Sequence, residues 1–202
     1  MNASSWKRVA DLSELKADQP YVVELDGREI LLLRRDDRIH AIGNTCSHFG
    51  APLNEGFAAD HEMVCPWHNA RFSLLNGEPL SPPALDGVPV YETRVDEGAV
   101  FVRLKSEPEI RMPEGPDPRA VLIVGAGAAG QSAAQTFRRE GFAGKILMLT
   151  RENDYPYDRT NLSKPYLSGQ MSDEDMPLRS KQFYDDAVDS SCLRHISRRA
   201  SK

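Results

Sequence analysis

The sequence predicts two domains of different class, a small all-β domain followed by part of a parallel α/β domain. Residues 6–105 hold short runs of β-branched and apolar residues separated by turn residues, which is typical of antiparallel strands. From residue 120 onward, an apolar run, a glycine-rich turn, an alanine-rich stretch and a second apolar run follow one another, as in a βαβ unit. We therefore expect domains at 1–105 and 120–202, joined by a linker at 106–119.

The strands of the first domain are marked by their composition and by the turns between them. Five runs are rich in β-branched and apolar residues: YVVEL, REILLLRR, RIHAI, VPVYETRV and AVFVRL. Asp26-Gly27, Asp36-Asp37 and Glu97-Gly98 lie between consecutive runs and are hairpin turn signals. The expected architecture is a small antiparallel sandwich.

The linker and the second domain differ sharply in composition. SEPEIRMPEGPDPR, residues 106–119, contains four prolines and four acidic residues, so we expect an extended, semi-rigid connector. AVLIVGAGAAGQSAAQTFRREGFAGKILMLT then has the order strand, helix, strand. Further on, residues 172–188 are expected to form a helix, with Ser172 as its N-cap and acidic residues in its first turn.

Composition excludes several classes of protein. The chain has 202 residues, of which 40% are hydrophobic and 27% are charged, as in ordinary soluble globular proteins. Three cysteines are too few for a disulfide framework and indicate a reducing compartment. The N-terminal segment is too polar for a signal peptide, and no apolar run is long enough to span a membrane. We expect a cytoplasmic protein with no membrane partner.

Charge is unevenly distributed along the chain. Residues 1–119 carry 20 acidic and 13 basic residues, whereas residues 120–202 carry 10 acidic and 12 basic residues. An acidic first half argues against a nucleic acid as partner and favours docking to a basic protein surface. The simpler interpretation is an acidic surface that keeps the protein in solution.

Two cysteines and two histidines have the spacing of a metal centre. Cys46-x-His48 and Cys65-x-x-His68 each supply one thiolate and one imidazole, with sixteen residues between the two pairs. A single zinc ion accepts this donor set as a tetrahedron. A [2Fe–2S] cluster also accepts it, with both cysteines on one iron and both histidines on the other. Zinc fingers usually pair cysteine with cysteine and histidine with histidine, so the mixed pairs favour the cluster over a zinc-binding module.

The sequence around these residues, CSHFGAPL and CPWHNARFSLLNGEPLSPPA, closely resembles Rieske-type ferredoxin domains over about the first hundred residues. The resemblance implies that Cys46 and Cys65 bind the inner iron. It also implies that His48 and His68 bind the outer iron near the surface, where electrons leave one at a time. A Rieske oxygenase would need a second iron site with two histidines and a carboxylate, and no catalytic domain follows to supply one.

Departures from the family pattern predict a low reduction potential. High-potential Rieske proteins carry an additional cysteine in each loop, where this chain has Ala51 and Trp67, so their disulfide is absent. Asn69 and Ala70 stand where glycine and serine are expected. Fewer hydrogen bonds to the sulfides leave the reduced, more negative cluster less stabilised. Asn69 in place of glycine is also expected to strain the second loop.

A glycine-rich turn in the second domain predicts a dinucleotide site. Gly125-x-Gly127-x-x-Gly130 follows an apolar strand and opens a helix, whose N-terminus favours a pyrophosphate. Glu152 follows the second strand and is the candidate for binding the ribose hydroxyls, although it lies farther from the motif than is usual.

The segment DYPYDRTNLSKPYLSGQ resembles FAD-dependent reductases of the pyridine nucleotide-disulfide oxidoreductase class, which include ferredoxin reductases and apoptosis-inducing-factor-like proteins. The resemblance implies that Arg159 contacts FAD and that Lys164 lies by the isoalloxazine ring. A cation there would stabilise the negative charge of a reduced flavin.

The two resemblances together imply electron transfer through a low-potential Rieske cluster, coupled to an FAD-dependent NAD(P)H oxidoreductase. Members of that family continue for several hundred residues, so we expect an incomplete, Rossmann-like FAD-binding domain that retains FAD weakly. NAD(P)H would bind only through a domain beyond this chain. The partner is expected to be a redox protein: an oxygenase, a cytochrome or a reductase. The alternative is a stand-alone Rieske electron carrier with a vestigial tail.

Overall fold

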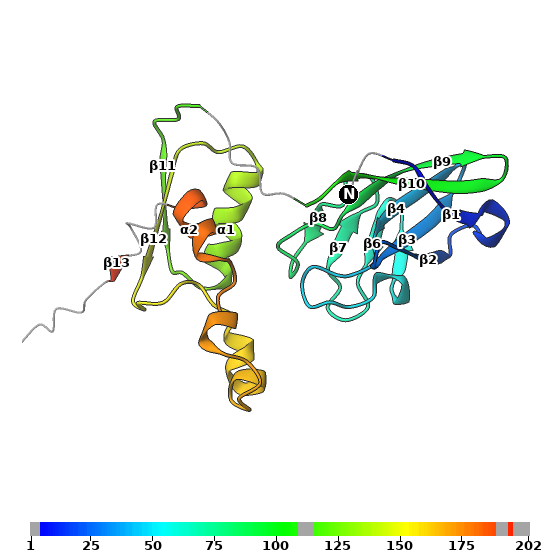
Figure 1. Cartoon of the computed structure of the whole chain (residues 1–202). Helices are drawn as coiled ribbons and strands as arrows, with labels where there is room; N and C mark the ends of the chain where they lie inside the picture. The colour runs from blue at the N-terminus through cyan, green and yellow to red at the C-terminus, as the bar shows by residue number, and fades with distance from the viewer. Residues whose placement is uncertain (1–4, 109–114, 189–193, 196–202) are drawn as a thin grey trace, which may run out of the picture. The chain divides into compact units, whose positions relative to one another are not determined.

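The computed structural model describes residues 5–108, 115–188 and 194–195. The chain divides into two compact units, residues 1–109 and residues 110–202 (Figure 1). Each unit has its own hydrophobic core, and each is described separately below.

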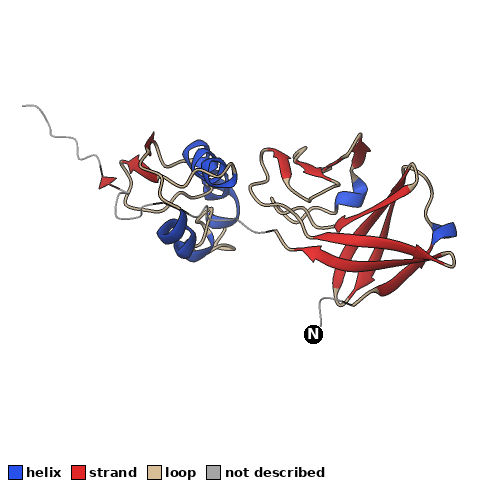
Figure 2. Cartoon of the chain, turned by 90° about the horizontal axis from the view of Figure 1, so that it is seen from above, coloured by secondary structure: helices blue, strands red, loops and turns tan. Residues whose placement is uncertain are grey.

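The first unit is built from antiparallel strands (Figure 2). A six-stranded sheet has the order β1-β10-β9-β4-β3-β2, and a four-stranded sheet has the order β5-β6-β7-β8. The strands of the large sheet are β1 (Lys7–Asp11), β2 (Pro20–Leu25), β3 (Arg28–Arg35), β4 (Arg38–Gly43), β9 (Val90–Asp96) and β10 (Ala99–Ser106). The strands of the small sheet are β5 (Phe57–Ala59), β6 (Glu62–Val64), β7 (Arg71–Ser73) and β8 (Pro79–Ser81). The predicted all-β first domain is confirmed.

The predicted hairpin turns are present. Asp26 and Gly27 both have positive φ, 51° and 77°, and join β2 to β3. Glu97 and Gly98, at 48° and 79°, join β9 to β10 in the same way. Two central residues of positive φ match the right-handed twist of the strands that they connect, which fixes the register of each hairpin.

Strand β3 separates two hydrophobic cores. Its residues Ile30 and Leu32 point into a core enclosed by the large sheet, whereas Leu31 and Leu33 point into a core shared with the small sheet. All four side chains are fully buried, because both faces of this strand are covered. The second of these cores also holds Cys46, so the loop after β4 is anchored in the interior.

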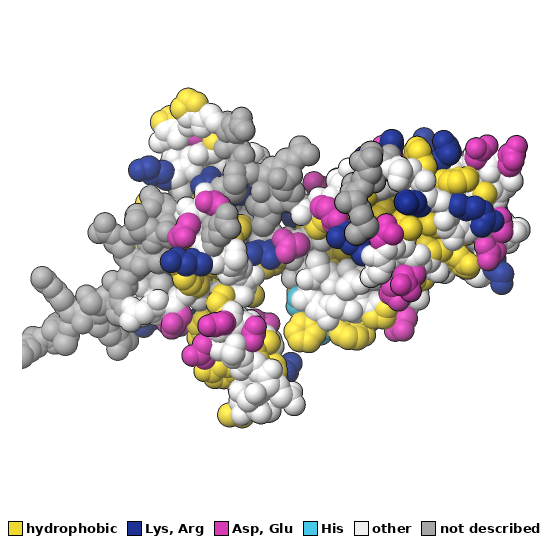
Figure 3. Space-filling model, viewed as in Figure 1, with side chains coloured by type: hydrophobic (Ala, Val, Ile, Leu, Met, Phe, Trp, Pro, Cys, Tyr) yellow, Lys and Arg dark blue, Asp and Glu magenta, His cyan; other side chains and the backbone are white. Residues whose placement is uncertain are grey.

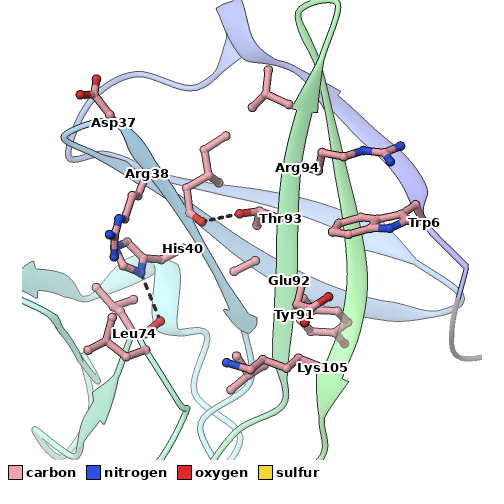
Figure 4. A pocket seen from close by; sticks show the side chains of 15 residues that line it. Trp6, Asp37, Arg38, His40, Leu74, Tyr91, Glu92, Thr93, Arg94 and Lys105 are labelled. Atoms are coloured by element: carbon pink, nitrogen blue, oxygen red, sulfur yellow. Dashed lines mark hydrogen bonds between the residues drawn. The ribbon is translucent and has the colours of Figure 1, made fainter.

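Strands β4 and β9 pair only near the end of β4 (Figure 4). Ala41 pairs with Tyr91 and Ile42 with Val90, and the strands separate beyond these pairs. Where the strands separate, a hydrogen bond of 2.7 Å from Thr93 Oγ1 to the carbonyl of Ile39 still joins them. Figure 4 shows this bond as a dashed line between the two strands. The tight part of the ladder therefore lies next to Gly43, where the chain leaves the sheet for the loop that carries Cys46.

The second unit begins with the predicted βαβ arrangement. β11 (Ala120–Val124) and β12 (Lys145–Thr150) pair in parallel, and α1 (Ala128–Arg139) connects them. β13 (Arg194–His195) adds a short parallel pairing to the other edge of β12. Ala134 of the helix packs with Ile146 and Met148 of β12, so the helix covers one face of the sheet. The α/β class expected for this part is confirmed.

The single helix predicted over residues 172–188 is wrong. Ser172 does cap a turn, the 3-10 helix Asp173–Asp175, but that turn ends there. α2 (Lys181–Ala187) is a separate helix that begins at its own N-cap, Ser180. Pro177 lies between them and cannot donate a backbone hydrogen bond, which interrupts the helix. In the described part of the chain, no helix is both long and apolar enough to cross a membrane.

Candidate metal centre and nucleotide site

Two loops of the first unit share one backbone design. The N–H of Cys46 donates to the carbonyl of Ala51 at 2.8 Å, and the N–H of Gly50 donates back to the carbonyl of Cys46 at 2.9 Å. The N–H of Cys65 donates to the carbonyl of Ala70 at 2.8 Å in the same way. The N–H of Asn69 donates to the carbonyl of Cys65 at 3.2 Å, which closes the second loop. The first loop follows β4 and the second joins β6 to β7, so each is held by strands at its base.

Asn69 fits the conformation that the second loop requires. Gly50 and Asn69 occupy equivalent positions, four residues after their cysteines, and have φ of 77° and 58°. Both values lie in the left-handed region, which asparagine enters more readily than other residues with a side chain. The expected strain at Asn69 is therefore smaller than a bulkier residue would cause.

The loops differ in the order of histidine and aromatic residue. His48 follows Cys46 by two positions and Phe49 by three, whereas Trp67 and His68 take these places after Cys65. The two imidazoles nevertheless meet, with ring centroids 4.9 Å apart and planes at 84°. Figure 3 shows hydrophobic side chains gathered beside histidine on one face of this unit.

The two thiols are buried in the core that both loops share. Cys46 is 2% exposed and Cys65 is 1% exposed, and neither forms a disulfide. Burial raises the pKa of the Cys46 thiol, backbone hydrogen bonds from His48 and Phe49 oppose that rise, and the Cys65 side chain beside it adds to it. A metal cation supplies the positive charge that keeps such thiols deprotonated.

This arrangement fits a group with two centres better than a single ion. A tetrahedral zinc ion would need all four donors around one point. A [2Fe–2S] cluster needs only two protein donors at each iron, with sulfur donors at one end and imidazoles at the other. The paired buried thiols and the paired outer imidazoles have that order.

The first loop depends on a buried residue that the sequence analysis missed. Asn44 is 1% exposed, and its side-chain amide donates to Glu29 at 2.9 Å and to Asn54 Oδ1 at 2.8 Å. Its own Oδ1 accepts from the backbone N–H of Asn54 at 2.9 Å. Ser47 also fixes this loop, by donating to the carbonyl of Asp86 at 2.6 Å. A polar residue directly after the apolar run of β4 was the available signal.

Gly56 brings the first loop's 3-10 turn against the strand that carries the second loop. The turn is Leu53–Glu55, and a Cβ placed at Gly56 would lie 1.9 Å from the carbonyl oxygen of Val64. Only glycine permits this close approach to Val64, the residue directly before Cys65.

Two other histidines lie apart from the centre. His40 is in β4 and His61 is in the turn between β5 and β6, and their ring centroids are 6.2 Å apart. His40 Nδ1 lies 3.3 Å from the carbonyl of Leu74, and burial lowers its pKa. The third cysteine, Cys192, lies outside the described residues.

The three glycines of the glycine-rich turn in the second unit have distinct roles. Gly125 has φ of 109° and makes the turn after β11. Gly127 is the N-cap of α1, and a Cβ there would meet nothing within 4 Å, so space is open before the helix. A Cβ at Gly130 would lie 2.0 Å from the carbonyl oxygen of Gly125, so the helix packs directly on the turn. This is the backbone arrangement that a pyrophosphate site requires.

Glu152 and Arg159 meet in this unit as an ion pair. Arg159 Nη2 lies 2.6 Å from Glu152 Oε1, and the guanidinium lies 5.3 Å from the ring centroid of Tyr157. Hydrogen bonding from Arg159 lowers the pKa of Glu152. Lys164 lies at a kink inside the helical segment Leu162–Tyr166 and is exposed. The structure thus brings two of the three expected cofactor side chains together, where they bind each other.

Comparison with protein families matches both units. Residues 5–92 match the Rieske [2Fe-2S] domain, and residues 119–199 match the pyridine nucleotide-disulphide oxidoreductase family. Together the two matches take in both candidate sites.

Individual proteins show the same division. Apoptosis-inducing factor 3 of Homo sapiens is 35% identical over 190 residues, which are 87% of this chain and 31% of that protein. The chain therefore spans about a third of the length of this relative. The ferredoxin component of naphthalene 1,2-dioxygenase/salicylate 5-hydroxylase systems from Ralstonia sp is 27% identical over 101 residues, 50% of this chain and 97% of that protein. The solved ferredoxin of carbazole 1,9a-dioxygenase from Nocardioides aromaticivorans IC177 is 36% identical, with a TM-score of 0.48, and covers 50% of this chain and 100% of its own.

Proposed function

We propose a function for this chain from its families: residues 5–92 belong to the Rieske [2Fe-2S] domain family, and residues 119–199 belong to the pyridine nucleotide-disulphide oxidoreductase family. The chain transfers electrons through a [2Fe–2S] cluster. The observation that carries this proposal is the pair of equivalent loops, which supply two buried thiols and two imidazoles whose ring centroids are 4.9 Å apart.

Cys46 and Cys65 would hold the inner iron, and His48 and His68 the outer iron. The cluster, when bound, accepts and releases one electron at a time. The core keeps water from the sulfur donors, whereas His68 is exposed and His48 is half-buried. The imidazole edge is therefore the side from which an electron leaves for a partner. Ala51 and Trp67, which cannot form a disulfide across the loops, support a low reduction potential.

The second unit would contribute to a flavin site. FAD, when bound, supplies the exchange between two-electron and one-electron transfer. Gly125, Gly127 and Gly130 would bind its pyrophosphate, and Glu152 its ribose hydroxyls, after exchanging the bond to Arg159. Arg159 would then contact FAD, and Lys164 would lie by the isoalloxazine ring.

The partner would be another redox protein. The Ralstonia relative is named as the ferredoxin component of dioxygenase systems, and the human relative joins both families in one longer chain. We take an oxygenase, a cytochrome or a reductase as the partner class for this chain, with NAD(P)H acting through a domain beyond it. Nucleic acid is not a partner in this proposal, because the first unit is acidic. Free thiols at Cys46 and Cys65 suit a reducing compartment such as the cytoplasm.

The test is the metal content and visible spectrum of the protein purified without oxygen. We expect about two iron and two sulfide per chain, as the cluster formula requires, with absorbance that bleaches on adding dithionite. Cys46→Ser and His68→Ala should each abolish this spectrum, because each removes one donor from one iron.

Matched controls are available in the same chain. Cys192→Ser and His61→Ala change the same residue types at positions that the proposal does not assign to the cluster, and they should leave the spectrum intact. A colourless protein that contains zinc would overturn the proposal in favour of a zinc-binding module. FAD that stays bound through gel filtration in stoichiometric amount would contradict the expected weak retention, whereas complete absence of FAD binding would favour a stand-alone electron carrier.

A further inference from the structure

Phe49 packs against both imidazoles of the candidate metal centre. Its ring centroid lies 5.9 Å from that of His48, with planes at 50°, and 6.4 Å from that of His68, with planes at 82°. The imidazoles themselves are 4.9 Å apart. Three rings from two loops therefore form one cluster, in which Phe49 contacts the histidine of its own loop and the histidine of the other loop.

Trp67 is the matching aromatic residue of the second loop, and it behaves differently. It is 52% exposed and Phe49 is 53% exposed, and each is adjacent in sequence to one of the two histidines. Among the described residues, however, Trp67 has no ring contact of the kind that Phe49 makes. The order of the two residues explains this difference. Histidine precedes the aromatic residue in the first loop and follows it in the second, so Phe49 and His68 occupy equivalent positions, and their rings face one another.

The contacts of Phe49 restrict how the imidazoles can turn. An imidazole bound to a metal through one nitrogen is still able to rotate about that bond. An edge-to-face aromatic contact resists this rotation, and one such contact is worth about a threefold to tenfold change in an equilibrium. An apolar ring beside the donors also removes water from their surroundings.

We propose that Phe49 is a positioning residue for His48 and His68, which this inference takes, from the proposed function, as the outer-iron ligands. Its ring holds the two imidazoles edge to face and keeps water from them. Reduction adds negative charge to the cluster, and an environment with less water stabilises that charge less. Phe49 therefore lowers the reduction potential and slows the loss of the cluster.

The test uses the full chain with four substitutions: Phe49→Ala, Phe49→Leu, Phe49→Tyr and Trp67→Ala. The reduction potential is measured by spectroelectrochemistry at one fixed pH, and the reduced state by EPR linewidth. Cluster loss is followed as bleaching of the visible absorbance in the presence of an iron chelator. Phe49→Ala should raise the potential, broaden the EPR signal and speed cluster loss about threefold to tenfold, as expected for one or two lost ring contacts.

The other variants separate the ring from its alternatives. Phe49→Tyr keeps the ring and should match the wild type. Phe49→Leu keeps an apolar side chain but loses the ring contacts, so it should keep the potential near that of the wild type and share the broadened EPR signal and faster cluster loss of Phe49→Ala. Trp67→Ala should match the wild type in all three measurements. Equal effects of Phe49→Ala and Trp67→Ala would overturn the positioning role, and so would a wild-type EPR linewidth and rate of cluster loss in Phe49→Leu. Absence of iron and sulfide from the wild type would overturn the proposed function itself, so the two failures are distinguishable.

Discussion

At the scale of single residues, the loop that carries Cys46 depends on a side chain that would not bind the metal itself. The side chain of Asn44, itself buried, makes three hydrogen bonds, and two of them hold Asn54 in the following turn. A buried polar group is costly when its partner is removed, because the remaining donor or acceptor stays unsatisfied. The geometry of Cys46 thus rests on an amide two residues before it.

Asn44→Ala should destabilise the first unit by about 2 kcal/mol, since it removes the three hydrogen bonds of a buried side chain. The measurement is urea unfolding followed by tryptophan fluorescence, because both tryptophans, Trp6 and Trp67, belong to this unit. Asn76→Ala is the control, since Asn76 is exposed and its side chain accepts only one local hydrogen bond, from the N–H of Glu78. An equal loss of stability in both variants would show that Asn44 has no special role.

At the scale of elements, the start of α1 illustrates how a motif determines a contact. Gly130 packs on the carbonyl oxygen of Gly125 at a distance that no Cβ permits, whereas Gly127 faces open space with φ of −87°. The two glycines therefore have different reasons to be glycine. The first is required for helix–turn packing and the second for room in front of the helix.

Gly130→Ala should lower the thermal midpoint of the second unit, because the turn at Gly125 or the helix must move away. Gly127→Ala should lower this midpoint less, because a Cβ there meets nothing and only the weaker preference for alanine at an N-cap opposes it. Thermal melting followed by circular dichroism at 222 nm compares the two variants. A midpoint that falls as far in Gly127→Ala as in Gly130→Ala would contradict the assigned contacts.

The elements also show what sequence reasoning can reach. Hairpins were predictable because Asp26-Gly27 and Glu97-Gly98 act through local backbone conformation. The break before α2 was also local, since Pro177 stops the helix, but acidic residues after Ser172 favoured one long helix in the prediction. The meeting of Phe49 with His68 and the pairing of Glu152 with Arg159 depend on how separate segments pack, which residue spacing does not encode.

At the scale of the whole molecule, the two units have separate cores and separate spectroscopic signals. In the described residues, the two α-helices belong to the second unit and the helices of the first unit are short 3-10 turns. Tryptophan fluorescence therefore reports on the first unit and helical circular dichroism mainly on the second. Arg138 is the best residue with which to perturb one unit alone. It is buried, and it donates to the carbonyls of Ala187, Phe142 and Gly144 at 2.8, 2.6 and 2.8 Å.

Arg138→Met should destabilise the second unit by about 2 to 4 kcal/mol, because three carbonyls lose a charged donor in a place that water does not reach. Arg139→Met is the matched control, since the neighbouring Arg139 is partly exposed and forms a surface ion pair with Glu140, which is worth little. The 222 nm transition should move in Arg138→Met and stay in Arg139→Met, while the tryptophan transition stays in both. A tryptophan transition that follows the 222 nm transition would mean that the units unfold together, and the cluster-bearing unit would then depend on the second unit for its stability.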